Sequence, residues 1–238
     1  MVLFCVASYA NSVTIYAAAS TRDAMEEIIQ AFEKQNPDVK MEVYFGASGK
    51  GFAQFQHGFQ YDIFLSADTQ YPQAIVDAGE AISEVVVFAT GALALYSLDP
   101  TLIKKGFDGF STADIKKISI ANPRLAPYGK AAVEAMQSHG IYTQVRSKIV
   151  TGESISQSVN FVQSGGADVG LVAFSLIALS ADSANYALVD QKHYTPIKQG
   201  FVLTHHAKEN KDAKKFADFI VSDDAQQTFQ KYGFGKAL

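Results

Sequence analysis

The sequence predicts an α/β protein of two lobes that are joined by two crossing strands. Segments with the period of a strand alternate with segments with the period of a helix, which is typical of a largely parallel sheet flanked by helices. Hydrophobic residues make up 48% of the 238 residues, enough to bury cores in one large domain or two ordinary ones. One apolar segment, residues 84–97, is long enough to leave one lobe and enter another.

The first lobe is predicted to begin with a strand at residues 13–18 and an amphipathic helix after it. One face of this helix carries apolar residues at i, i+3, i+4 and i+7, namely Met25, Ile28, Ile29 and Phe32. We expect the helix to end near Asn36, because the following Pro37 disfavours helical geometry in the residue before it. Further strands are predicted at residues 41–45 and 61–66, and further helices at residues 49–57 and 72–77.

The second lobe is predicted between two crossings. The first is the segment 84–97, with Gly91 near its middle, and the return crossing is residues 195–205. Between them we expect strands at residues 118–121, 147–150 and 169–174, and helices at residues 128–138 and 156–163. Two more helices, residues 208–221 and 223–231, follow the return. Lobe I is thus predicted to comprise residues 11–90 and 198–238, and lobe II residues 91–197, with a cleft between them suited to capture by closure.

Composition and charge narrow the classes of function. The formal net charge is −4, and no basic face typical of nucleic-acid binding is visible. Beyond the N-terminus, no stretch approaches the ~18 apolar residues of a transmembrane helix, so the protein is not expected to be embedded in a membrane. Residues 1–10 are predicted to be the remainder of a secretory signal peptide, because the small residues Ser8 and Ala10 suit cleavage after Ala10. A buried first strand or a cloning remnant is the alternative. Cys5, the single cysteine, falls in this segment, so the mature chain is expected to form no disulfide.

Two serines stand where predicted strands give way to predicted helices. Ser20 precedes the first helix and is expected to cap it, with Asp23 completing a capping box. Ser48 lies between the second strand and the next helix, among small residues. Helix N-termini expose unpaired N–H groups and carry partial positive charge, so they bind anions without a cationic side chain. Serine also caps helices that bind nothing, so this pattern alone leaves a binding role open.

Motifs of enzymes are missing from the sequence. Residues 46–51 match neither a Walker A loop nor a nucleophile elbow. Asp62 and Asp68 flank the third strand, a commonplace position for aspartate. The five histidines form no metal-ligand pattern, and the adjacent pair His205 and His206 is expected to point to opposite faces of a strand. A serine-nucleophile enzyme remains an alternative only if a histidine lies within hydrogen-bond reach of Ser20 or Ser48.

Four motifs in order resemble the periplasmic molybdate-binding proteins. They are Ala-Ala-Ala-Ser at residues 17–20, Gly-Ala-Ser-Gly-Lys at 46–50, Tyr-Asp-Ile-Phe-Leu-Ser-Ala-Asp at 61–68, and the stretch from Ser-Asp-Asp-Ala-Gln-Gln at 222–227 to Lys-Tyr-Gly-Phe at 231–234. The first three are fairly specific, whereas the last recurs across related binding proteins. The resemblance runs from about residue 12 to the C-terminus. It implies a type II periplasmic binding protein fold, with two Rossmann-like lobes, and an oxyanion held by neutral donors.

The resemblance also implies which residues bind. Ser20 and Ser48 would donate from hydroxyl and backbone N–H, with Thr21 a weaker candidate. Tyr128, in the loop at residues 122–129, and Ile155, at a helix start in the second lobe, would each donate a backbone N–H. Some members add a tyrosine hydroxyl, but the matching position here is Ala173, followed by Phe174, so that contact is expected to be missing.

The expected ligand is molybdate or tungstate, delivered to the membrane permease of an ABC importer. Molybdenum or tungsten enters only as the oxyanion, with no direct protein–metal bond, and no cofactor and no catalytic residue are expected. Both anions are fully deprotonated near neutral pH, whereas phosphate keeps a proton that a site without an acceptor leaves unpaired. Sulfate, another oxyanion or a small organic anion is the alternative ligand. We expect a monomer in the periplasm, since closing lobes have no need of an oligomer.

Overall fold

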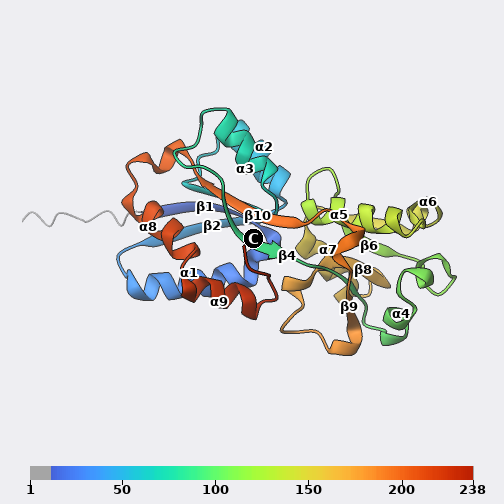
Figure 1. The fold of residues 1–238 in the computed structure, drawn as a ribbon. Coiled ribbons are helices and arrows are strands. Elements are labelled where there is room, and N and C mark those ends of the chain that lie inside the picture. The colour runs from blue at the N-terminus through green and yellow to red at the C-terminus, as the bar shows by residue number, and fades with distance from the viewer. Residues whose placement is uncertain (1–11, 238) are drawn as a thin grey trace, which may run out of the picture.

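The computed structural model describes residues 12–237 and consists of two lobes (Figure 1). The blue N-terminal and red C-terminal parts of the chain together form one lobe, and the green to orange middle forms the other. Each lobe is built around a five-stranded sheet. The segment interpreted as a signal peptide, with Cys5, lies outside the described residues. The two-lobed α/β architecture predicted from the alternating pattern is confirmed.

The sheet of lobe I has the strand order β2-β1-β3-β10-β4. Strand β1 (Ser12–Ala18) runs parallel to β2 (Lys40–Gly46) and to β3 (Ile63–Ser66). Strand β10 (Ile197–Leu203) lies antiparallel between β3 and β4 (Val86–Gly91). The sheet is therefore mixed, because the chain returns from lobe II through its middle.

Helices cover both faces of this sheet (Figure 1). One face carries α1 (Arg22–Gln35), α8 (Lys211–Ile220) and α9 (Asp223–Lys231), and the other carries α2 (Ser48–Gln56) and α3 (Gln70–Asp77). The apolar stripe of α1 is buried as predicted, and the Phe32 ring meets Phe216 of α8 edge-on with centroids 4.9 Å apart. Helix α1 ends at Gln35, two residues before the predicted proline stop.

The sheet of lobe II has the order β7-β6-β8-β5-β9. Strand β6 (Ile118–Ala121) is parallel to β7 (Ile149–Gly152) and β8 (Val169–Ala173), while β5 (Leu93–Tyr96) is antiparallel to β8 and β9 (Tyr186–Leu188). Helices α5 (Pro127–Ser138) and α7 (Ile155–Gln163) pack against it, with the shorter α4 (Pro100–Lys105) and α6 (Tyr142–Val145) at the periphery. Strand β9, α4 and α6 were not predicted, since three to six residues are too few to show a period.

Both crossings exist, but each differs from the prediction in detail. The first divides at Ala92 into β4 of lobe I and β5 of lobe II. The return strand β10 ends at Leu203, so the prediction that His205 and His206 lie on opposite faces of a strand is wrong. They lie in the short 3-10 helix His205–Lys208, whose first turn is capped by the Thr204 hydroxyl accepting from the His206 N–H at 3.2 Å.

Candidate functional site

The carboxyl ends of the parallel strands of both lobes, β1, β2 and β3 in lobe I and β6, β7 and β8 in lobe II, face each other across the cleft, which is closed in this structure. Small residues at strand ends in lobe I, such as Ala19 and Ala47, belong to the same buried cluster as Ala126 and Ile155 of lobe II. The Gly49 N–H donates to the Leu125 carbonyl across the lobes at 2.8 Å. Ligands of open α/β sheets bind at such strand ends, so this contact zone is the candidate site.

Ser20 lies in a single 3-10 turn, Ala19–Thr21, between β1 and α1. Its side chain is buried and its Oγ donates to Oε1 of Gln199 at 3.4 Å. The capping prediction is wrong: α1 begins at Arg22 after the cap residue Thr21, and no side chain caps it. The Thr21 hydroxyl donates to the Ala18 carbonyl at 2.8 Å, so its proton is used within the turn. Of the two hydroxyls, that of Ser20 is the better placed to serve a ligand.

Ser48 is the first residue of α2 and follows directly on the end of β2. It is 1% exposed, and its Oγ accepts the Ala67 N–H at 3.0 Å. An oxygen that accepts from a backbone amide still has its own proton to donate. Ala67 follows β3, so this bond connects the ends of β2 and β3, the two strands that flank β1. The hydroxyl is thereby oriented by a backbone group before any ligand contributes.

In lobe II, Tyr128 and Ile155 each occupy the first turn of a helix. Tyr128 follows Pro127 at the start of α5, and Ile155 is the first residue of α7, after the cap Ser154. The Ser154 hydroxyl accepts the Gln157 N–H at 3.3 Å, which leaves the earlier amides of that turn without an intrahelical acceptor. Both Tyr128 and Ile155 are buried against lobe I. The four residues of the sequence hypothesis therefore come from a 3-10 turn and three α-helix starts, with two residues in each lobe.

Hydrogen bonds across the lobes hold the Ser20 turn from the far side. The Ser175 hydroxyl donates to the Ser20 carbonyl at 2.7 Å, and the Ser156 hydroxyl donates to the Ala19 carbonyl at 3.2 Å. Neither serine was singled out in the sequence, because their partners lie more than a hundred residues away and only the fold brings them together. Gln199 was also missed, although an amide that follows Lys198 in a strand ending Gly-Phe-Val-Leu is a detectable signal.

The position of the tyrosine used by some family members is occupied by an apolar pair. Ala173 ends β8 and is fully buried, and the Phe174 ring packs against Tyr186 with centroids 5.2 Å apart. Neither side chain has a hydroxyl to donate.

Charged groups lie at the edges of the contact zone. Lys50 and Glu153 form an exposed ion pair across the lobes, with Nζ and Oε2 3.7 Å apart. Asp68 follows β3, and burial raises the pKa of its carboxyl. Its Oδ1 already accepts from the Ser66 hydroxyl at 2.9 Å and from the Tyr71 N–H at 3.2 Å. The hydroxyls of Ser20 and Ser48 and the backbone N–H groups of the candidate residues are themselves neutral.

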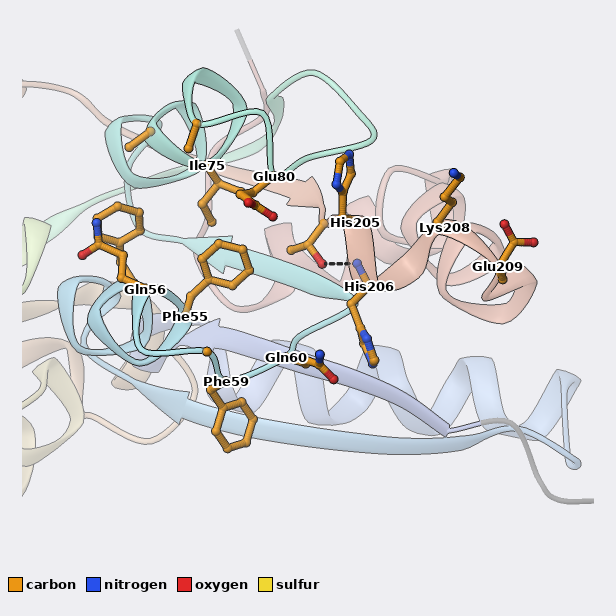
Figure 2. Close-up of a pocket in the computed structure, with 15 residues that line it drawn as sticks. Phe55, Gln56, Phe59, Gln60, Ile75, Glu80, His205, His206, Lys208 and Glu209 are labelled. Carbon is orange, nitrogen blue, oxygen red and sulfur yellow. Dashed lines mark hydrogen bonds between the residues drawn. The ribbon is translucent and has the colours of Figure 1, made fainter.

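The histidines lie elsewhere. His139 and His193 pack against each other on lobe II, with ring centroids 4.1 Å apart. His205 and His206 line a hollow of about 790 Å³ at the amino end of β3, together with Phe55 and Phe59 (Figure 2). Within residues 12–237, the hydrogen-bond partners found for the Ser20 and Ser48 side chains include no histidine. The same part of the chain holds no cluster of metal-ligating side chains and no helix able to cross a membrane.

Two lobes, paired crossings and a cleft lined by helix N-termini define a two-lobed binding protein of the type II periplasmic class. The chain belongs to the family of bacterial extracellular solute-binding proteins, whose model matches residues 13–235.

Named relatives share most of the chain. It is 35% identical to the molybdate-binding protein ModA of Rhodobacter capsulatus over 94% of this chain and 88% of the relative. It is 31% identical to the ModA of Azotobacter vinelandii over 98% and 93%. The solved periplasmic molybdate-binding protein of Azotobacter vinelandii superposes with a TM-score of 0.89 at 26% identity, covering 95% of this chain and all of that one.

Proposed function

We propose that this protein captures molybdate or tungstate in the periplasm and delivers it to the permease of an ABC importer. The observation that carries the proposal is the convergence of the Ser20 turn and three α-helix starts, from both lobes, on one closed, buried zone. Relatives that share 94–98% of the chain are named for molybdate binding. No chemical step on the ligand is involved, and the closed form is what the permease recognises.

In the proposed site, neutral groups supply six hydrogen bonds. Ser20 and Ser48 each donate a hydroxyl and a backbone N–H, and Tyr128 and Ile155 each donate a backbone N–H. Charge-assisted hydrogen bonds contribute ~1.5–3 kcal/mol each, and nanomolar affinity requires about 12 kcal/mol net of ordering costs. Six donors reach that range where four would not. Because the donors are divided between the lobes, one lobe alone holds the anion weakly.

The absence of a free acceptor is what selects a fully deprotonated anion. The carboxyl of Asp68, which follows β3, accepts through Oδ1 from the Ser66 hydroxyl and from the Tyr71 N–H. Monohydrogen phosphate would bury a proton without a partner, at a cost of about 1–3 kcal/mol. Sulfate carries no such proton, so only the size of the pocket can exclude it. Sulfate, another oxyanion or a small organic anion is accordingly the second candidate ligand.

Other parts of the proposal concern the chain as a whole. Residues 1–10 are an export signal cleaved near Ala10, the mature protein is a periplasmic monomer without cofactor, and the lobes divide at residues 90–91 and 197–198. The serine-nucleophile alternative requires a histidine beside Ser20 or Ser48. The hydrogen bonds of both serines to Gln199 and Ala67 argue against it.

Calorimetric titration of the anion-stripped protein with molybdate, tungstate, sulfate and phosphate tests this proposal. The expected result is tight one-to-one binding of the first two and no heat from the others. Binding of sulfate with equal affinity would move the assignment to the second candidate. Silence for molybdate and tungstate would refute the proposal, and organic anions and ester substrates would then be screened.

A further inference from the structure

A buried polar network joins the Ser20 turn to the hinge and to lobe II. Gln199 Nε2 donates to the Tyr128 hydroxyl at 3.5 Å, and Gln199 Oε1 accepts from the Ser20 hydroxyl at 3.4 Å. The Ser175 hydroxyl donates to the Ser20 backbone carbonyl at 2.7 Å. All four residues are at most 5% exposed. Tyr128 thus contacts lobe I through its side chain, a role separate from the backbone N–H assigned to it above.

The chemistry of the four groups gives the network a direction. The Gln199 amide N–H₂ can only donate, so the Tyr128 oxygen accepts from it and keeps its own proton to donate. Gln199 Oε1 can only accept, so the Ser20 hydroxyl is the donor in their hydrogen bond. In this structure it donates to Gln199 Oε1 at 3.4 Å. An oxyanion is the stronger acceptor, because charge-assisted hydrogen bonds are roughly twice as strong as neutral ones.

The hinge leaves room for this arrangement at one position. Gly91 ends β4 in the first crossing, and a Cβ built there would lie 2.1 Å from the Tyr128 hydroxyl oxygen and 3.1 Å from Gln199 Nε2. Gln199 lies at the register shift between β10 and β4, where such an irregularity re-aims a side chain. Both crossings therefore help to place the Tyr128 hydroxyl. Gly91 of the first crossing leaves room for it, and Gln199 of the return crossing supplies the amide that donates to it.

We propose that Tyr128 is a positioning residue whose hydroxyl holds the Gln199 amide, so that Gln199 orients the Ser20 hydroxyl for the bound oxyanion and ties that contact to lobe closure. The proposal rests on the proposed function in naming the anion. The hydrogen bonds run from the Ser20 hydroxyl to Gln199 Oε1 and from Gln199 Nε2 to the Tyr128 hydroxyl, and each hydrogen bond in such a chain polarises the next. Because Tyr128 belongs to lobe II and Ser20 to lobe I, the chain is complete only when the lobes are shut.

The test is a double-mutant cycle on molybdate affinity. Tyr128→Phe keeps the ring and the backbone N–H, and we expect it to raise Kd roughly tenfold, mainly through faster release, as for loss of one buried hydrogen bond. If Tyr128 acts through Ser20, the change costs little once Ser20→Ala is present. Tyr61→Phe is the matched control, since Tyr61 is equally buried and its hydroxyl donates to Gln54 at 3.0 Å within lobe I. An unchanged Kd, or losses that add in full, would overturn the proposal.

A second measurement separates failure of this inference from failure of the proposed function. Spin labels at Asp77→Cys on α3 and Gln137→Cys on α5, in a Cys5→Ser background, report the distance between the lobes without ligand. We expect Tyr128→Phe to lower the closed fraction relative to wild type, whatever anion the protein binds. If the wild-type protein binds neither molybdate nor tungstate, the proposed function fails. The distance between the spin labels then still tests whether the Tyr128 hydroxyl stabilises the closed form. A closed fraction that is the same in Tyr128→Phe and in wild type would refute the positioning role of Tyr128.

Discussion

Replacing Gly91 with alanine is expected to disfavour the closed form. The new Cβ would lie 2.1 Å from the Tyr128 hydroxyl oxygen, whereas ordinary contact begins at 3.4 Å, so the hydroxyl must retreat by about 1.3 Å. Tyr128 is 1% exposed and has no space to move into while the lobes are shut. Overpacking of this kind costs about 1–3 kcal/mol. When the lobes part, Tyr128 withdraws from Gly91, so the strain falls on the ligand-bound state and weakens molybdate affinity roughly 5- to 150-fold.

Calorimetric titration and thermal unfolding of Gly91→Ala, with and without molybdate, measure both states. The expected pattern is a raised Kd with nearly unchanged unfolding of the anion-free protein. Gly170→Ala is the matched control, because a Cβ there would meet Val162 inside lobe II at 2.9 Å, which lowers stability without touching the cleft. Wild-type affinity in Gly91→Ala would refute the steric reasoning, and so would equal destabilisation of both states.

Three further changes have expected outcomes. Ser48→Ala removes a donor and the acceptor of the Ala67 N–H, so molybdate Kd measured by calorimetry should rise roughly 5- to 150-fold, for ~1–3 kcal/mol; an unaltered Kd would exclude Ser48 from the site. Lys50→Ala removes an exposed ion pair with Glu153, and such pairs contribute at most ~1 kcal/mol, so the molybdate Kd should change less than fivefold and the change should vanish at high salt. A large, salt-independent loss of affinity would show that Lys50 contacts the anion. Burial and His193 lower the pKa of His139 below 6.5, so its contribution to stability is present above pH 6.5 and is lost as pH falls through the lowered pKa. His139→Gln should therefore flatten the fall in Tm between pH 7 and 5, and a pH profile identical to that of wild type would contradict this assignment.

Elements with a strong period or a clear stop were predictable from the sequence. The helix at residues 223–231 and the strand at residues 118–121 have the predicted bounds. The first crossing was predicted as one strand, because an apolar run does not reveal that Ala92 leaves one sheet before Leu93 joins the next. The pattern of apolar residues shows that a segment is buried, but it does not show in which sheet. Both halves of this run are buried, each in its own lobe, so the pattern does not reveal the division.

The candidate site divides in the same way. Ser20 and Ser48 were singled out because a helix start after a strand is a local feature of the chain, whereas Tyr128 and Ile155 were named only through the family resemblance. Ser175 and Gln199 were missed, because their contacts with Ser20 depend on how two lobes meet. The failed capping prediction for Ser20 has a local cause as well, since a 3-10 turn between β1 and α1 moves the cap of the helix one residue on, to Thr21.

The placement of β10 has a consequence for how the chain folds. Within the described sheet, β4 pairs with β10 alone, and β10 is synthesised only after the whole of lobe II. Lobe II is contiguous and forms from contacts closer in sequence, whereas lobe I must close a loop that contains its neighbour. Lobe I therefore completes last, and a nascent chain that ends before residue 197 carries an open sheet edge at β3. Refolding is expected to show two phases, of which the slower restores the pairing of β10 with β3 and β4.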